Sequence, residues 1–388
     1  MGKIVDIIRN IAFCFNEIAC CLPGLKNIYL PYPQDYISLK DLKSGVSEKI
    51  IFPEKHNEYS DANCLYGTPH PDFKGRKIIE FPASVWTLKN GIVFSDYGYV
   101  LLKQKKEIKL VRELSVPMFD LDFNEHYFHK KYRWRYFNKV KKINGTVAVI
   151  NSSCSSHNYF HWIIEALPRL FLIKESGINP DYYYISNELP FHKNALNVFN
   201  IPEDKIISPK INTCIEATNL IVPSLTFQPK KKTAFAGNYA DVLPSWVYTA
   251  LNSLLRIDSK KRKKIYISRV NAYKRKMLNE GELISYLESK GFEIIDLEGL
   301  DIKEQAELFM SASTIVAPHG AGLANLIFCK PKTRLIEILS NKYSSDYCKM
   351  VAENARIDYS CLFFPSQNEN FDFYVDMDIL IEKIDNLI

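Results

Sequence analysis

A glycine-rich turn in the second half of the chain could bind an anion. Residues 317–325 read APHGAGLAN and lie between a predicted strand at 314–318 and a predicted helix that begins near Gly322. Gly320 and Gly322 allow the backbone to approach a ligand closely, and the N–H groups at a helix N-terminus attract phosphate. His319 would add a side-chain donor. The alternative is a tight strand-to-helix turn that binds nothing.

A basic loop follows another predicted strand of the same half. The strand 264–269 ends in Arg269, Arg275 lies in the loop, and Asn279 is expected to cap a helix that ends at Gly291. Arginine suits a bidentate grip on phosphate, so these cations could stabilise a departing nucleoside diphosphate in a sugar transfer that uses no metal. A solvated basic loop is the alternative.

A carboxylate, Glu337, lies near the carboxyl end of the predicted strand 334–339. It could accept both hydroxyls of a ribose, as acidic residues do in dinucleotide-binding folds, or it could form a structural ion pair. Carboxyl ends of parallel strands share one sheet edge, so these groups should lie together. The residues predicted to bind a donor are Arg269, Arg275, Asn279, Glu280, His319, Gly320, Ala321, Gly322, Asn325 and Glu337.

The first half contains a histidine motif, SSHNYFHWIIEALPRL, after the predicted strand 146–152. Asn158 should cap a helix over 158–174, which Pro168 should kink or end early. His161 and Glu165 are four residues apart and so share a helical face. A carboxylate that orients an imidazole makes a general base for an acceptor hydroxyl. The candidate catalytic residues are His157, His161 and Glu165, and the alternative is a hydrogen-bonded histidine at a domain interface.

Alternating strands and helices position these motifs. Strands of about six residues separated by helices of about ten predict parallel, doubly wound sheets. Asn90-Gly91 predicts a hairpin, and residues 228–244 read as a linker between two Rossmann-like units that face a cleft. The predicted fold class is therefore α/β with a β-rich N-terminal extension. The predicted segments are a helix at 1–22, an N-terminal domain at 23–235 (β-rich at 76–115, α/β at 146–225) and a C-terminal domain at 236–388; the resemblance given below makes the N-terminal one the acceptor-side domain and the C-terminal one the nucleotide-sugar domain.

Composition narrows the class of protein. The chain has 388 residues, 47% of them apolar, and basic residues exceed acidic ones by 50 − 44 = +6. This charge is too mild for a nucleic-acid binder. Nine cysteines without zinc spacing are typical of a reducing cytoplasm. Residues 4–22 form a predicted amphipathic helix that either packs on the body or lies in a membrane interface, and no transmembrane span is expected.

Together these motifs, including ISR…R…NE, APHGAGLANLIFC and LIEI, resemble glycosyltransferase family 61 over about residues 146–340. The resemblance implies a GT-B fold and an inverting, metal-independent transfer from a nucleotide sugar, with a UDP-sugar as the expected donor. It implies that the C-terminal domain holds the donor and that the N-terminal domain holds a glycan or lipid-linked glycan acceptor. The expected setting is capsular or other surface polysaccharide synthesis, in the cytoplasm or at the inner face of the plasma membrane.

Two other functions stay open at the level of sequence. Asp120-Leu121-Asp122 and Asp376-Met377-Asp378 match the DxD pattern of a metal-dependent GT-A transferase, although so loose a pattern arises by chance. The chain could also be a non-catalytic scaffold that binds a nucleotide sugar or a glycan in a polysaccharide assembly complex.

Overall fold

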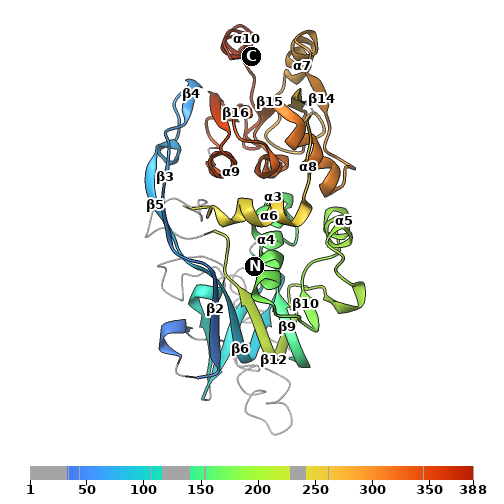
Figure 1. Ribbon diagram of the computed structural model, residues 1–388. Coiled ribbons are helices and arrows are strands. Elements are labelled where there is room, and N and C mark those ends of the chain that lie inside the picture. Colours follow the sequence, from blue (N-terminus) through green and yellow to red (C-terminus); the bar gives the residue numbers. More distant parts are fainter. Residues whose placement is uncertain are drawn as a thin grey trace, which may run out of the picture. The chain divides into compact units, whose positions relative to one another are not determined.

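The computed structural model divides the chain into two compact units (Figure 1). The first unit comprises Met1–Glu54 and Phe81–Asp241, and the second comprises Lys55–Glu80 and Val242–Ile388. The structure describes residues 33, 35–42, 44–105, 107–115, 140–152, 154–227, 242–260, 262–343 and 345–387. The predicted helix at 4–22 and most of the predicted linker lie outside these residues. Within the described ranges, no helix has the length and apolarity that a membrane crossing requires.

The second unit is built on a six-stranded sheet in which all neighbouring strands are parallel. Its order is β14-β13-β15-β16-β17-β4. The five strands of the C-terminal half therefore follow the order 2-1-3-4-5 of a doubly wound fold, with a topological switch point between β13 and β15. The strands are β13 (Lys263–Ile267), β14 (Glu293–Ile295), β15 (Ala312–Pro318), β16 (Arg334–Ser340), β17 (Asp358–Phe364) and β4 (Asn63–Tyr66).

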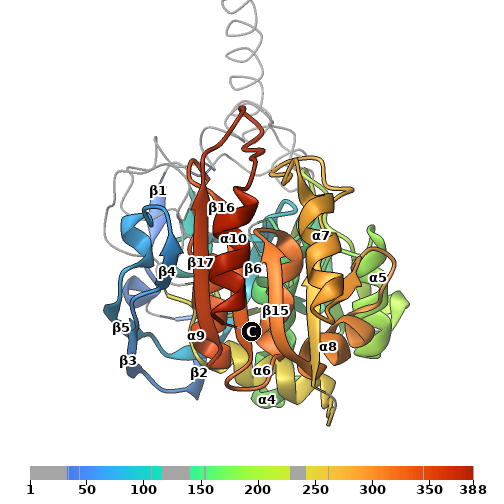
Figure 2. The ribbon, with the colours of Figure 1, turned by 90° about the horizontal axis from the view of Figure 1, so that it is seen from above.

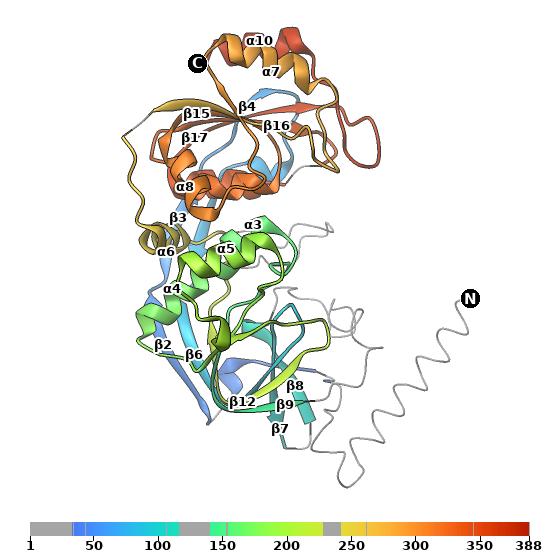
Figure 3. The same ribbon diagram turned by 90° about the vertical axis from the view of Figure 1, so that its right-hand side faces the viewer.

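Helices cover both faces of this sheet, because its strands are apolar on both sides. Helices α7 and α10 lie over one face, and α8 and α9 lie over the other (Figures 1, 2 and 3). Leu283 of α7 and Leu380 of α10 join Val316 and Ile336 of the strands in one buried cluster. The elements are α6 (Trp246–Leu255), α7 (Glu280–Ser289), α8 (Ile302–Ser311), the 3₁₀-helix η7 (Ala321–Phe328), α9 (Tyr347–Ala355) and α10 (Met377–Asp385).

A segment from the N-terminal half completes the second unit. Residues 55–80 carry β3 (Lys55–Tyr59), β4, the short η2 (Pro71–Phe73) and β5 (Arg76–Glu80). Their contacts are long-range: Arg76 pairs with Asp346 at 2.9 Å, and the Tyr59 hydroxyl donates to the Leu243 carbonyl at 3.0 Å. The units therefore differ from the predicted contiguous domains, because strand pairing across some 300 residues leaves no local signal in the sequence.

The first unit is built on a nine-stranded mixed sheet with the order β1-β8-β7-β6-β12-β9-β10-β11, and β2 pairs with β6. Strands β12, β9, β10 and β11 are parallel neighbours, whereas β12 and β6 are antiparallel. The strands are β1 (Asp35–Ile37), β2 (Val46–Phe52), β6 (Ala83–Phe94), β7 (Tyr99–Gln104), β8 (Glu107–Val111), β9 (Lys141–Val149), β10 (Tyr182–Tyr184), β11 (Ile206–Ile207) and β12 (Cys214–Pro223). The described helices are η1 (Leu39–Asp41), η3 (Arg112–Leu114), α3 (Tyr159–His161), the π-helix η5 (Trp162–Ala166), α4 (Leu167–Ser176), α5 (Pro190–Val198) and η6 (Glu203–Lys205).

The predicted hairpin at Asn90-Gly91 is wrong. Both residues lie inside the single long strand β6, although Asn90 has the positive φ of 52° that such turns use. A Cβ atom on Gly91 would meet the Leu220 Cβ atom at 2.7 Å, so close packing against β12 requires the glycine. The chain turns instead at Ser95–Gly98, where the Gly98 N–H donates to the Ser95 carbonyl. The mixed α/β class itself is confirmed.

Candidate functional site

In the second unit the two predicted anion-binding motifs meet at the topological switch point. Ser268 and Arg269 follow β13, and His319 and Gly320 follow β15, its neighbour in the sheet. Open α/β sheets bind ligands in the crevice at this place. The helix η7 starts directly after Gly320, and its first N–H groups have no intrahelical acceptor. The predicted helix therefore exists, as a 3₁₀-helix rather than an α-helix.

Arg269 lies directly against the glycine turn. A Cβ atom on Gly320 would stand 2.8 Å from the Arg269 Cζ atom and closer still to Nη1. Gly320 has extended backbone, so the glycine is required by this close approach and not by its φ. The Arg269 Nη2 group donates to the Lys274 carbonyl at 3.0 Å, which fixes the guanidinium across the end of the strand. The turn and the arginine thus form one surface.

Arg275 places a second cation near the first. Burial lowers the pKa of Arg269, and the charge of Arg275 lowers it further, because the two guanidinium groups repel each other. Arg275 adopts a left-handed backbone with φ of 57° and lies over the Tyr343 ring, with Cζ 4.5 Å from its centroid. The Nε groups of both arginines are buried and make no hydrogen bond within the described part of the chain. Two repelling cations with unused donors are suited to an anion between them.

Glu337 does not bind ribose, because it is fully buried and both its oxygens are engaged. Oε1 accepts from His319 Nδ1 at 2.6 Å, and Oε2 accepts from the Tyr359 hydroxyl at 2.5 Å. The carboxylate therefore orients His319 and leaves the Nε2 atom of the ring available for a ligand. Cys348 lies beside this pair, and the three residues offer atoms within 4.8 Å of one another, as a metal site would. Burial, then Glu337, raises the Cys348 pKa well above its ordinary value, so the thiol stays protonated when no ion is bound.

Three other predicted donor ligands have structural roles instead. Glu280 is buried and its Oε1 accepts from the Tyr266 hydroxyl, the Ser268 hydroxyl and the Arg269 N–H, so it fixes the end of β13. Asn279 occupies the predicted N-cap position of α7, but its side chain makes no capping hydrogen bond; its amide instead donates to the Val375 carbonyl and accepts from the Val375 N–H. Asn325 is fully buried and donates to Gln305 and to the Gly322 carbonyl.

Those roles were beyond sequence reasoning, because the partners are remote in the chain. Gly322 and Ala321 remain at the turn itself, where the backbone faces the switch point. A Cβ atom on Gly322 would stand 2.5 Å from the Leu297 Cδ1 atom, so this glycine too is required by close packing. Of the DxD pairs, Asp376 caps α10 through the Ile379 N–H. The pair at Asp120 lies outside the described residues.

In the first unit the histidine motif follows β9 and contains a π-helix that the sequence did not predict. Asn158 caps the helix as expected, accepting from the Phe160 N–H at 2.9 Å. The π-turn η5 then inserts between α3 and α4, and Pro168 falls in the first turn of α4 without ending the helix. The helical backbone runs without a break from α3 through η5 into α4, so the π-turn directly before Pro168 is what accommodates the missing N–H. Helix segments of this rare kind occur frequently at functional sites.

His161 and Glu165 form the predicted pair. His161 Nδ1 donates to Glu165 Oε1, and the Ser152 hydroxyl donates to Glu165 Oε2 at 3.1 Å. Burial lowers the pKa of His161, but the charge of Glu165 and its hydrogen bond outweigh burial, so the pKa is raised overall. Because Nδ1 donates to the carboxylate, Nε2 is the ring nitrogen that carries the basic lone pair. His157 is exposed, and its Nδ1 lies 3.1 Å from the Ser156 hydroxyl.

The arginine of the histidine motif, Arg169, has a structural role that the sequence did not predict. It is fully buried, and its guanidinium donates to the carbonyls of Ile150, Asn151 and Pro223. These carbonyls terminate β9 and β12, so Arg169 ties together the carboxyl ends of two neighbouring parallel strands. Burial lowers its pKa to about 9, and the charge of Glu165 opposes that shift. Arg169 is therefore a positioning residue beneath the histidine motif.

Comparison with known proteins agrees with these motifs. Residues 159–336 match the family model Glycosyltransferase 61. The match covers just under half of the chain. It includes His161, Arg269 and Gly320 and ends one residue before Glu337. A beta-1,2-xylosyltransferase, RCN11 of Oryza sativa subsp. japonica, is 25% identical over 89 residues. That alignment covers 23% of this chain and only 16% of the rice protein. Both likenesses support a glycosyltransferase.

Proposed function

We propose that this protein is an inverting glycosyltransferase that moves a sugar from a nucleoside diphosphate to a glycan. The observation that carries the proposal is the pair of repelling guanidinium groups, Arg269 and Arg275, beside the glycine turn at the switch point. The match of residues 159–336 to Glycosyltransferase 61 supports the same activity. We further propose a UDP-sugar as donor and a GT-B arrangement in which the two units face a cleft.

On the donor side, Arg269 and Arg275 would bind the diphosphate together with the first N–H groups of η7 and the Nε2 atom of His319. When the glycosidic bond breaks, negative charge moves onto the diphosphate oxygens, and these fixed donors stabilise it in the transition state. Two arginines and a helix N-terminus would supply the positive charge that a divalent ion supplies in GT-A enzymes, so we propose transfer without a metal.

On the acceptor side, His161 Nε2 would take the proton of the acceptor hydroxyl. The freed oxygen attacks the anomeric carbon as the bond to the diphosphate oxygen breaks, and the configuration inverts. Glu165 fixes the tautomer and stabilises the imidazolium, while Ser152 fixes Glu165. His161 is better suited than His157, because a buried carboxylate holds its ring.

We place this transfer in capsular or other surface polysaccharide synthesis, with a glycan or lipid-linked glycan as acceptor. The mildly basic chain, and cysteines without a paired pattern, favour a cytoplasmic location. Residues 4–22, outside the described residues, would dock the protein on the inner face of the plasma membrane.

Calorimetric binding of UDP, GDP, dTDP and CMP, with magnesium and then with EDTA, tests the donor half. We expect tight binding of one nucleoside diphosphate that EDTA does not change and that Arg269→Ala weakens by at least about tenfold, to a Kd that is still measurable. Arg262→Ala is the matched control, because Arg262 is exposed before β13, at the opposite sheet edge. Binding that needs magnesium would favour a GT-A mechanism. Binding of no nucleotide would leave a glycan-binding scaffold as the better explanation.

A further inference from the structure

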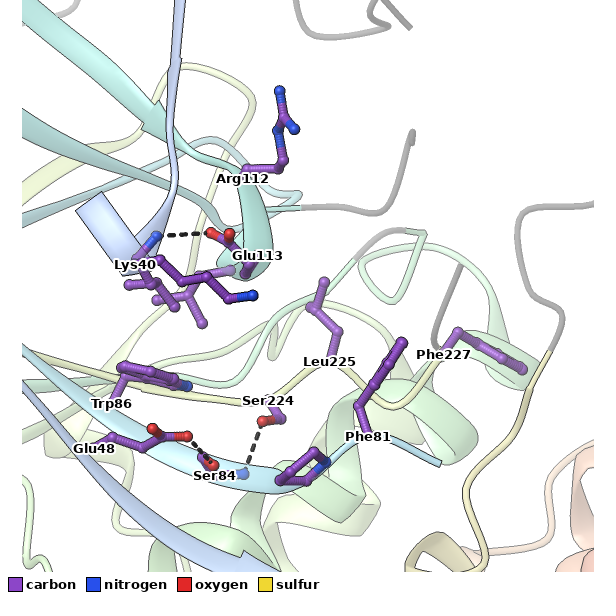
Figure 4. Close-up of a pocket in the computed structure, with 13 residues that line it drawn as sticks. Lys40, Glu48, Phe81, Ser84, Trp86, Arg112, Glu113, Ser224, Leu225 and Phe227 are labelled. Carbon is purple, nitrogen blue, oxygen red and sulfur yellow. Dashed lines mark hydrogen bonds between the residues drawn. The ribbon is translucent and has the colours of Figure 1, made fainter. Parts of the chain in front are cut away.

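The first unit contains a cavity of about 410 Å³ that the proposed mechanism has not used (Figure 4). This volume is typical of small-molecule pockets. Figure 4 shows Trp86, Glu48 and Phe81 on one side of it and Arg112 and Glu113 on the other. The full lining is Leu39, Lys40, Glu48, Phe81, Pro82, Ser84, Trp86, Arg112, Glu113, Leu114, Ser224, Leu225 and Phe227.

The cavity lies at the sheet edge that carries the histidine motif. Ser224 and Leu225 directly follow β12, whose last carbonyl, that of Pro223, accepts from Arg169. Phe227 stacks on Phe160, with ring centroids 6.4 Å apart at an interplanar angle of 14°. Phe160 in turn meets the His161 ring edge to face at 5.8 Å. One wall of the cavity is therefore two aromatic contacts from the proposed base.

The lining combines broad apolar rings with a few polar groups. Trp86 is half-buried and Phe81 is 50% exposed, so both rings can offer a face to a ligand. Both oxygens of Glu113 are already engaged, with the Ser38 hydroxyl and the Leu39 N–H. Glu48 uses one oxygen to accept from the Ser84 hydroxyl and keeps the other.

This combination fits a sugar ring. A pyranose has an apolar C–H face, which stacks on an aromatic side chain, and a rim of hydroxyl groups, which hydrogen-bond to carboxylates and amines. Lys40 and Glu48 in the lining offer such groups. The formal charges of the lining cancel, because Lys40 and Arg112 balance Glu48 and Glu113. A neutral glycan suits this lining better than an anionic nucleotide.

We propose that this cavity is a subsite for a sugar of the acceptor glycan, with that ring stacked on Trp86 and the glycan continuing past Phe227 so that the reactive hydroxyl of another of its sugars reaches His161. The inference rests on the proposed function, because it uses His161 as the base. Ten of the thirteen lining residues precede the stretch that matches the family model. Acceptor choice would thus reside in a part of the chain that the family match does not cover.

Saturation-transfer difference NMR with a panel of methyl glycosides of glucose, galactose, N-acetylglucosamine, mannose and xylose tests the site directly. We expect transfer from protein aromatic protons to the ring protons of at least one glycoside. Trp86→Ala should weaken that binding about tenfold, since an aromatic contact is worth roughly this factor. Phe81→Ala is a second variant at an exposed ring. Tyr182→Ala is the control, an exposed aromatic residue at the amino end of β10 and so at the other sheet edge.

The result separates this inference from the proposed function. If Trp86→Ala raises the KM for the acceptor while UDP affinity and donor hydrolysis without acceptor stay unchanged, the subsite is supported. If that variant transfers sugar with the wild-type acceptor KM, the subsite is refuted and the transferase stands. Binding of no glycoside by the wild type, or equal binding by Trp86→Ala, also overturns the subsite. Binding of no nucleoside diphosphate by the wild type would instead refute the proposed function.

Discussion

Replacing Gly320 with alanine should damage the donor site and spare the fold. The added Cβ atom would stand 2.8 Å from the Arg269 Cζ atom and 3.2 Å from its Cδ atom, where contacts of 3.4 Å or more are ordinary. The guanidinium is the far end of a flexible side chain, so it can move away. We expect the free energy of unfolding to change by less than about 1 kcal/mol, because the methyl group also restricts the unfolded chain.

The affinity for UDP should fall far more than the stability, because the displaced Arg269 guanidinium is the group proposed to bind the phosphate. A hydrogen bond to a charged group contributes about 1.5–3 kcal/mol, which corresponds to a rise of about 10- to 150-fold in the Kd for UDP. Calorimetry on the wild type and Gly320→Ala, beside thermal unfolding, measures both quantities. Gly281→Ala is the control: nothing lies within 4 Å of its Cβ position, and it sits in α7, where alanine should stabilise the helix slightly.

A double variant makes the reasoning refutable. In an Arg269→Ala background the clash is gone, so adding Gly320→Ala should leave the Kd for UDP unchanged. A further loss of the same size in that background would show that the turn acts through its own backbone and not through the arginine. Wild-type affinity in the single variant Gly320→Ala would refute the proposed position of the diphosphate.

Three more predictions follow from the first unit. His161→Ala should lower the transfer rate at least about 100-fold with unchanged UDP affinity, and the wild-type rate should rise with pH through the raised pKa of His161, a limb that Glu165→Gln should move to lower pH. Arg169→Met should lower the free energy of unfolding by about 3 kcal/mol in urea titrations, because three buried carbonyls lose their donor. Burial lowers the pKa of His192 to about 4, so the neutral ring is favoured in the folded state: its stabilisation is present above the ordinary pKa of 6.5 and is lost as pH falls toward 4. Unfolding titrations at pH 7 and pH 5 should show a smaller difference in His192→Gln than in the wild type.

The structure revised roles more often than positions. Motifs that follow a strand were found where the sequence placed them, since a strand, a turn with glycine and a helix are local patterns. The predicted role of a residue differs from the observed one where a partner distant in the chain determines it. Glu337 hydrogen-bonds to His319 and Tyr359, and Asn279 hydrogen-bonds to Val375. Asn90-Gly91 predicted a turn on local grounds, but pairing of β6 with β12 over its whole length overrides that preference.

By itself the sequence determined the α/β class. It also located the glycine turn, the basic loop and the histidine motif, and the edge of the sheet on which each of them lies. Periodicity and turn residues are written in neighbouring positions, so one chain suffices to read them. Only the tertiary structure decided that residues 55–80 join the second unit and that a π-turn lets the helix pass Pro168. It alone also showed that the Arg269 side chain packs directly against Gly320. Each of these depends on which remote atoms compete for the same space or hydrogen bond, and that competition is resolved only when the chain is packed.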